Sequence, residues 1–129
     1  MSKLVYPVVL HPNPDGGFTV TIPDLDISTG GDNLADSIVM ARDAIGSLLL
    51  YLEDKKAPIP KPSATLPTCE GDDMSSFVDI DPAEYRRSVD FKSIRKNVTV
   101  PAYICYKAEQ ANINFSQALQ EALKEKLSI

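Results

Sequence analysis

Three polar side chains of the kinds that contact DNA bases recur at alternate positions near the C-terminus. Arg95, Asn97 and Thr99 hold these positions in the stretch "RKNVTV", and Val98 and Val100 hold the intervening apolar ones. An extended strand would place the polar set on one face and the valines on the other. Arg can donate two hydrogen bonds to guanine, Asn can pair with adenine, and Thr can contact a thymine methyl. The pattern predicts a strand whose polar face contacts bases.

This strand has no partner within its own segment. An unpaired strand edge is a liability, and a segment of about 35 residues cannot bury a sufficient core alone. We therefore predict a homodimer in which two copies of the strand pair antiparallel; further pairing into a tetramer stays open. The alternative is a solvated strand face in a dimerisation module that binds no DNA, although such faces usually carry Glu and Lys instead.

A second set of polar side chains alternates in "PDLDIS". Asp24, Asp26 and Ser28 would lie on one side of the chain if this segment were extended. Their oxygens could then accept hydrogen bonds from a His or Lys of a basic partner. The alternative is that Asp24 and Asp26 only cap a turn.

Charge is divided unevenly along the 129 residues, whose net charge is −5. Residues 1–91 contain seven basic and fifteen acidic residues, a net charge of −8, whereas residues 92–129 contain six basic and three acidic residues, a net charge of +3. This asymmetry indicates two parts with different partners.

Five aspartates in the acidic part could in principle form a two-metal nuclease site: Asp15, Asp24, Asp26, Asp32 and Asp43. Simpler roles explain several of them. Asp15 lies in a turn sequence, Asp32 at a helix start, and Asp43 on an expected solvated helix face. His11 is expected in a loop with no Ser or Cys arranged beside it. We therefore expect no catalytic residue.

Metal and cofactor sites are not expected either. Cys69 and Cys105 are unclustered, and a structural zinc site needs about four ligands. The longest apolar run is far short of the roughly 20 residues that span a bilayer, and the N-terminus does not look like a signal peptide. A cytoplasmic protein with no membrane partner is expected.

The N-terminal part reads as a hairpin followed by a long helix. Strands over 4–10 and 18–23 flank the turn-rich "HPNPDGG", and Pro7 suggests an edge position or a bulge. A third short strand is expected in "DLDISTGGD". Asn33 resembles a helix N-cap, with Asp36 in the reciprocal capping-box position.

Apolar residues then recur at helical spacing from Leu34 to about residues 53–56. Gly46 interrupts this helix, at a cost of about 1 kcal/mol relative to Ala. A last strand is expected through Phe77 to Ile80, and Asp81 resembles the N-cap of a further short helix. A hinge is expected between residues 88 and 94.

Two helices should follow the C-terminal strand. Pro101 begins the first, and Asn114 caps the second after the turn "NIN". The second helix is expected to turn these residues inward: Phe115, Ala118, Leu119, Ala122, Leu123 and Leu127.

The stretch "RKNVTVPAYICYKAEQANINFSQALQEAL" resembles the ribbon–helix–helix family of DNA-binding proteins. In that family paired strands enter the major groove as a ribbon. The resemblance implies that Arg95, Asn97 and Thr99 face base edges. It also implies that the backbone amides of Phe115 and Ser116 hold a phosphate.

The N-terminal part resembles the HicB antitoxin family. The resemblance rests on "DGG" at 15–17, "PDL" at 23–25, "GD" at 31–32, the following long helix and "PIPKPS". It implies a partial ribonuclease-H-like fold without activity, which masks a small basic HicA-like ribonuclease toxin that degrades mRNA. It also implies that the C-terminal module represses the operon by binding operator double-stranded DNA.

The expected fold is therefore α+β. Residues 1–90 would form a toxin-neutralising domain, a small antiparallel sheet packed on a long helix. Residues 94–129 would form a ribbon–helix–helix dimerisation and DNA-binding domain. The alternative is a stand-alone ribbon–helix–helix repressor with a ligand-sensing N-terminal domain, although no Gly-rich phosphate-binding loop supports a ligand site.

Overall fold

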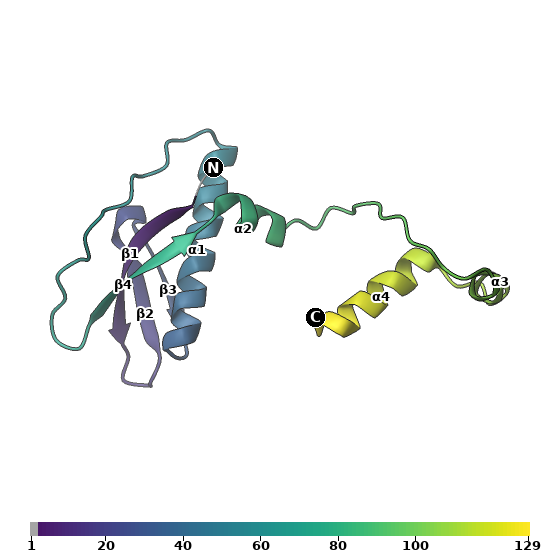
Figure 1. The fold of residues 1–129 in the computed structure, drawn as a ribbon. Coiled ribbons are helices and arrows are strands. Elements are labelled where there is room, and N and C mark those ends of the chain that lie inside the picture. The colour runs from purple at the N-terminus through teal and green to yellow at the C-terminus, as the bar shows by residue number, and fades with distance from the viewer. Residues whose placement is uncertain (1–2) are drawn as a thin grey trace. The chain divides into compact units, whose positions relative to one another are not determined.

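The computed structural model describes residues 3–129, and the chain divides into two compact units, Met1–Phe91 and Lys92–Ile129 (Figure 1). The first unit combines a four-stranded sheet with a long and a short helix, and the second contains two helices. The α+β class is confirmed.

The sheet of the first unit is antiparallel throughout. Its strands are β1 (Leu4–Pro12), β2 (Phe18–Ile22), β3 (Ile27–Gly31) and β4 (Met74–Ile80), in the spatial order β3-β2-β1-β4. The four strands predicted for the N-terminal part are thus confirmed, and β3 and β4 are the two edges.

Pro7 lies in β1, a central strand of the sheet, but on a stretch of it that pairs on one side only, so its position is locally that of an edge. The register explains why the ladder tolerates a residue without an N–H. β1 pairs with β2 only from Val9 to Pro12, whereas it pairs with β4 from Leu4 to Leu10. At Pro7, β1 therefore has only β4 as a neighbour. On the other side no strand lies opposite Pro7, so its missing N–H leaves no ladder hydrogen bond to β2 unmade.

Helix α1 (Leu34–Asp54) begins where its capping residues predict. The Asp36 N–H donates to the Asn33 side chain over 2.8 Å. The Asp36 carboxylate accepts from the backbone N–H of Asp32 over 2.9 Å. In the reciprocal capping box the donor would be the N–H of Asn33, one residue later. The bond from Asp32 still satisfies a backbone donor beside the helix start.

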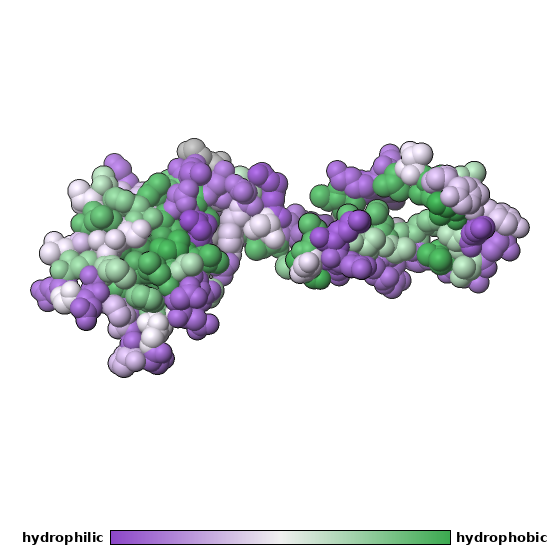
Figure 2. All heavy atoms as spheres, turned by 60° about the horizontal axis from the view of Figure 1, so that its bottom comes forward, coloured by the Kyte–Doolittle hydropathy of each residue, from purple (hydrophilic) through white to green (hydrophobic). Residues whose placement is uncertain are grey.

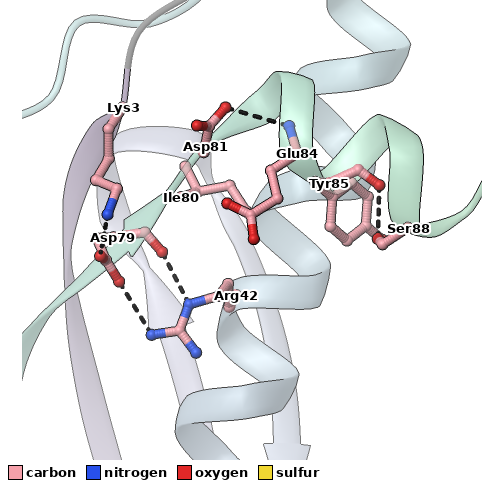
Figure 3. A pocket seen from close by; sticks show the side chains of 8 residues that line it. All are labelled: Lys3, Arg42, Asp79, Ile80, Asp81, Glu84, Tyr85 and Ser88. Atoms are coloured by element: carbon pink, nitrogen blue, oxygen red, sulfur yellow. Dashed lines mark hydrogen bonds and ion pairs between the residues drawn. The ribbon is translucent and has the colours of Figure 1, made fainter. Parts of the chain in front are cut away.

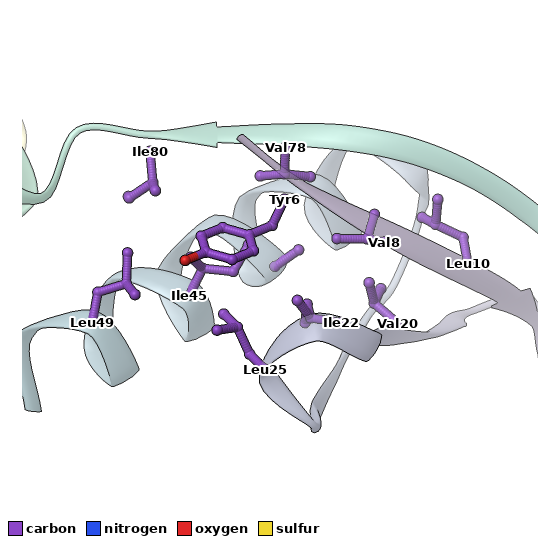
Figure 4. Close-up of a cluster of buried hydrophobic side chains, with 11 residues drawn as sticks. Tyr6, Val8, Leu10, Val20, Ile22, Leu25, Ile45, Leu49, Val78 and Ile80 are labelled. Atoms are coloured by element: carbon purple, nitrogen blue, oxygen red, sulfur yellow. The ribbon is translucent and has the colours of Figure 1, made fainter. Parts of the chain in front are cut away.

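One face of the sheet packs on α1 and encloses the core (Figure 4). The buried cluster draws on every strand but β3, on the turn between β2 and β3, and on the inward face of α1: Tyr6, Val8, Leu10, Val20, Ile22, Leu25, Ala41, Ile45, Leu49, Val78 and Ile80. Strand β3 adds the partly buried Ile27. Gly31 allows the end of β3 to approach α1, because a Cβ there would lie only 2.5 Å from the Ser37 backbone nitrogen.

Helix α2 (Pro82–Ser88) is fastened to α1 by Tyr85. A Cβ at Gly46 would lie 2.7 Å from the Tyr85 ring. The Tyr85 hydroxyl donates to the Asp43 carboxylate over 2.6 Å and lies 2.9 Å from the Ser47 hydroxyl. Asp43 was expected only to face solvent, but it binds Tyr85 and so helps to hold α2 on α1. Gly46 leaves space for the Tyr85 ring.

The second unit contains α3 (Ala102–Gln110) and α4 (Phe115–Leu127), both predicted. The Asn114 side chain accepts from the Gln117 N–H over 3.0 Å, which confirms the expected cap. Residues 92–101 form no strand in the single chain, so the strand predicted to pair with a second copy stays a prediction. A strand is defined by ladder hydrogen bonds, and residues 92–129 contain no second strand to make them.

Gly46→Ala should lower the stability of the first unit in the parent protein but raise it in a Tyr85→Ala background. Alanine gains about 1 kcal/mol of helix propensity over glycine, but overpacking against the ring costs about 1–3 kcal/mol. Hydrogen exchange of the α1 amides in the full chain would measure both free energies. Equal stabilisation in the two backgrounds would contradict the proposed role of the glycine.

Candidate protein and DNA contact surfaces

The acidic segment before β3 is not extended. Pro23–Leu25 forms a 3₁₀ turn, η1, and Asp26 has the left-handed backbone angles φ 53° and ψ 45°. The alternating geometry expected for Asp24, Asp26 and Ser28 is therefore wrong. Pro23 and Asp24 both favour turns, and they bend the chain before β3 begins at Ile27.

Asp24 is held within its own unit. Its carboxylate accepts hydrogen bonds from the Ser63 N–H over 2.6 Å and from the Ser63 hydroxyl over 2.8 Å. Nearby, the buried Tyr6 donates its hydroxyl to the Pro60 carbonyl over 2.7 Å. These contacts fasten the proline-rich segment after α1 to the sheet, so Asp24 has a structural role.

Asp26 is exposed just before β3, and Ser28 is exposed within it. Within residues 3–129, no hydrogen bond or ion pair engages the Asp26 carboxylate or the Ser28 hydroxyl. Aspartate tolerates the left-handed conformation better than most residues. Of the three predicted contact residues, these two are the ones whose polar groups are available to a partner.

A cavity of about 350 Å³ lies where β4 meets α1 and α2 (Figure 3). The Arg42 guanidinium donates to the Asp79 carbonyl over 2.9 Å and to its carboxylate over 3.1 Å. Lys3 lies 3.3 Å from the same carboxylate. Hydrogen bonds from Arg42 and then Lys3 hold the pKa of Asp79 below its usual value.

Tyr85 lines the same cavity. The pKa of its hydroxyl is raised, mainly because the group is partly buried and also because it donates a hydrogen bond to Asp43. Arg42 and Lys3 are thus both engaged by Asp79. Sequence reasoning did not find this cluster, because its members are far apart in the chain and follow no motif.

His11 lies in β1 rather than in a loop. Its Nδ1 is 2.8 Å from the Asp73 carboxylate and its Nε2 is 3.2 Å from the Thr21 hydroxyl. The three residues connect β1 to β2 and to the segment just before β4. Among the described residues 3–129, no group of three or more His, Cys, Asp or Glu side chains is placed to hold a metal ion.

The second unit has almost no interior. Of residues 92–129, all of which the structure describes, none is buried. Apolar side chains lie at its surface (Figure 2), including Val98 at 62% exposure, Leu123 at 48% and Leu127 at 65%. Helix α4 is therefore amphipathic, and the apolar face predicted to point inward is exposed in this chain.

The predicted DNA contacts occupy two places in this unit. Arg95, Asn97 and Thr99 are exposed in the segment before α3. Phe115 and Ser116 are the first two residues of α4. The first N–H groups of a helix have no acceptor within it, so these two amides are free of intrahelical bonds.

No helix among residues 3–129 combines the length and apolar character needed to cross a membrane.

Known proteins similar to this chain include curated antitoxins. It is 42% identical over 65 residues to Antitoxin HicB 1 of Photorhabdus laumondii subsp. laumondii, which covers 48% of this chain and 42% of that protein. It is 37% identical over 60 residues to Antitoxin HicB of Escherichia coli K12, which covers 44% of each. The matches span less than half the length of these relatives.

Two solved structures show the same fold along nearly the whole chain. A toxin–antitoxin complex from Streptococcus pneumoniae matches with a TM-score of 0.57 and 21% identity, covering 96% of this chain and 99% of that one. A crystal structure of the antitoxin HicB3 matches with a TM-score of 0.53 and 25% identity, covering 95% and 97%.

The model of one family spans both units. It is described as the HicB-like antitoxin of bacterial toxin–antitoxin systems, and it matches residues 6–125. The chain belongs to the HicB-like antitoxin family.

Proposed function

We propose that the first unit binds and masks a small basic HicA-like ribonuclease toxin, and that the second unit dimerises and represses the operon by binding operator DNA. The observation that carries this proposal is the division of charge within one antitoxin chain, −8 over residues 1–91 and +3 over residues 92–129. Each unit thus has the charge that its proposed partner requires.

Charge complementarity explains how the first unit would find the toxin. A protein that degrades RNA must hold a polyanion and therefore presents a basic surface. An acidic surface can occupy that site in place of the phosphate backbone and accelerate association by electrostatic steering. Asp26 and Ser28 are the predicted contact residues with available oxygens, whereas Asp24 keeps the neighbouring segment in place.

The second unit would complete its fold by pairing with a second copy. Residues 95–100 of the two chains would form an antiparallel ribbon, and the apolar faces of α3 and α4 would share one core. The ribbon would present Arg95, Asn97 and Thr99 to base edges in the major groove. The amides of Phe115 and Ser116 would bind a backbone phosphate.

Asp26→Asn should weaken toxin binding by about 2 kcal/mol if its carboxylate is buried against a cation of the toxin. Asparagine keeps the tolerance for the left-handed backbone, so folding should be unaffected. Asp72→Asn is the matched control, because Asp72 is also exposed and makes no hydrogen bond or ion pair among residues 3–129.

The measurement is titration with the small basic protein that co-purifies when the chain is expressed from its own locus, together with rescue of growth. Equal binding by the two variants would exclude Asp26 from the contact. The absence of any such co-purifying protein would overturn the proposed function.

Arg95→Ala should cost about 1–3 kcal/mol of operator affinity and relax specificity at one base position. Lys126→Ala, which removes a cation from the last turn of α4, is the control and should leave base preference unchanged. Binding to the DNA upstream of its own gene, at several salt concentrations, would measure both. Unchanged affinity in a triple Ala variant at 95, 97 and 99 would rule out the ribbon.

A further inference from the structure

The two edges of the sheet are protected unequally. On β4, Arg42 donates to the Asp79 carbonyl over 2.9 Å and the Ser76 hydroxyl donates to the Phe77 carbonyl over 3.3 Å. Lys3 adds a second cation at this edge, 3.3 Å from the Asp79 carboxylate. Charged side chains at an edge strand are a common protection against pairing with another chain.

The β3 edge has no such protection. Its sequence, "ISTGG", contains no charged residue and no proline. Among residues 3–129, no side chain forms a hydrogen bond to the backbone of Ile27–Gly31. Gly31 must remain bare because of its close approach to Ser37. Every second residue of this strand therefore presents N–H and C=O groups to a possible neighbour.

Apolar side chains of α1 lie on the flank that faces β3. Arg42 reaches Asp79 on β4, so its flank of the helix faces the opposite edge. At about 100° per residue, Met40 and Tyr51 lie roughly halfway around the helix from Arg42. They are 36% and 57% exposed. Methionine and tyrosine are both enriched at protein interfaces.

Acidic residues stand at both ends of the strand in sequence. Asp26 precedes β3 and Asp32 follows it, and within residues 3–129 neither carboxylate makes a hydrogen bond or ion pair. A second copy of this unit would bring a net charge of −8 against another −8. The charges thus favour a basic partner.

We propose that the β3 edge accepts an extended strand of the basic toxin, which adds a fifth strand to the sheet. Main-chain hydrogen bonds to Ile27–Gly31 would fix its register. Its alternate side chains would cover Met40 and Tyr51, and its cations would lie near Asp26 and Asp32. This inference rests on the proposed function and specifies how its protein contact is made.

A matched pair of variants in the full chain tests the proposal. Ser28, Thr21, Val9 and Ser75 form one row across the sheet, since Ser28 pairs with Thr21, Thr21 with Val9, and Val9 with Ser75. Ser28→Lys places a cation on the β3 edge, and Ser75→Lys makes the same change on the β4 edge. The probe is the basic protein that co-purifies with the chain. We expect about tenfold weaker binding for Ser28→Lys and less than about twofold for Ser75→Lys.

Amide hydrogen exchange gives a second readout that does not depend on substitution. In the complex, alternate amides of Ile27–Gly31 should become protected while those of Met74–Ile80 stay unchanged. Binding of the basic protein with unaltered β3 exchange and equal effects of the two variants would overturn the β3 contact but leave the proposed function intact. If the β3 amides are already protected from exchange in the protein without its partner, and the protein self-associates through Met1–Phe91, the β3 edge pairs with a second copy instead. If no basic protein co-purifies, the proposed function and this inference both fail.

Discussion

Residues 92–129 bury none of their side chains within one chain, and the proposed assembly depends on this constraint. Two short helices gain little stability from hydrogen bonds alone and depend on packing of an apolar face. The apolar stripe of α4 includes Leu119, Leu123 and Leu127, all exposed. In the proposed dimer a second copy would cover this stripe, and pairing of the two copies would also satisfy the unpaired backbone of residues 95–100. In this account the DNA-contacting face exists only in the dimer.

The first unit is different because it encloses its own core and uses many of its acids internally. Asp24 binds Ser63, Asp36 and Asp81 cap helices, Asp43 binds Tyr85, and Asp79 binds Arg42. The net charge of this unit would still steer a basic partner, because steering depends on the summed field rather than on individual free carboxylates. Specific contact, in contrast, requires unengaged groups, and these occur around β3.

Local signals in the sequence predicted most of the elements. Helix α1 follows from its apolar spacing and from Asn33, and α4 follows from Asn114, because capping depends on neighbours within four residues. The role of Gly46 could not be predicted, since the Tyr85 ring that requires it is 39 positions away. Pro7 indicated an edge position, but that this edge is one end of a central strand depends on where the pairing with β2 stops, which the sequence does not show. The extended geometry predicted around Asp24 was wrong, because the segment is rich in residues that favour turns and does not alternate as a strand does.

The most direct measurement is the dependence of α3 and α4 stability on protein concentration. Hydrogen exchange of their amides in the full chain, from about 1 to 100 µM, would report their free energy of unfolding, with the α1 amides as an internal control. If the second unit is folded only as a dimer, its unfolding free energy per dimer should rise by about 1.4 kcal/mol for each tenfold increase in concentration, while α1 stays constant. Protection of α3 and α4 that is independent of concentration, in a protein that sediments as a monomer, would contradict the account.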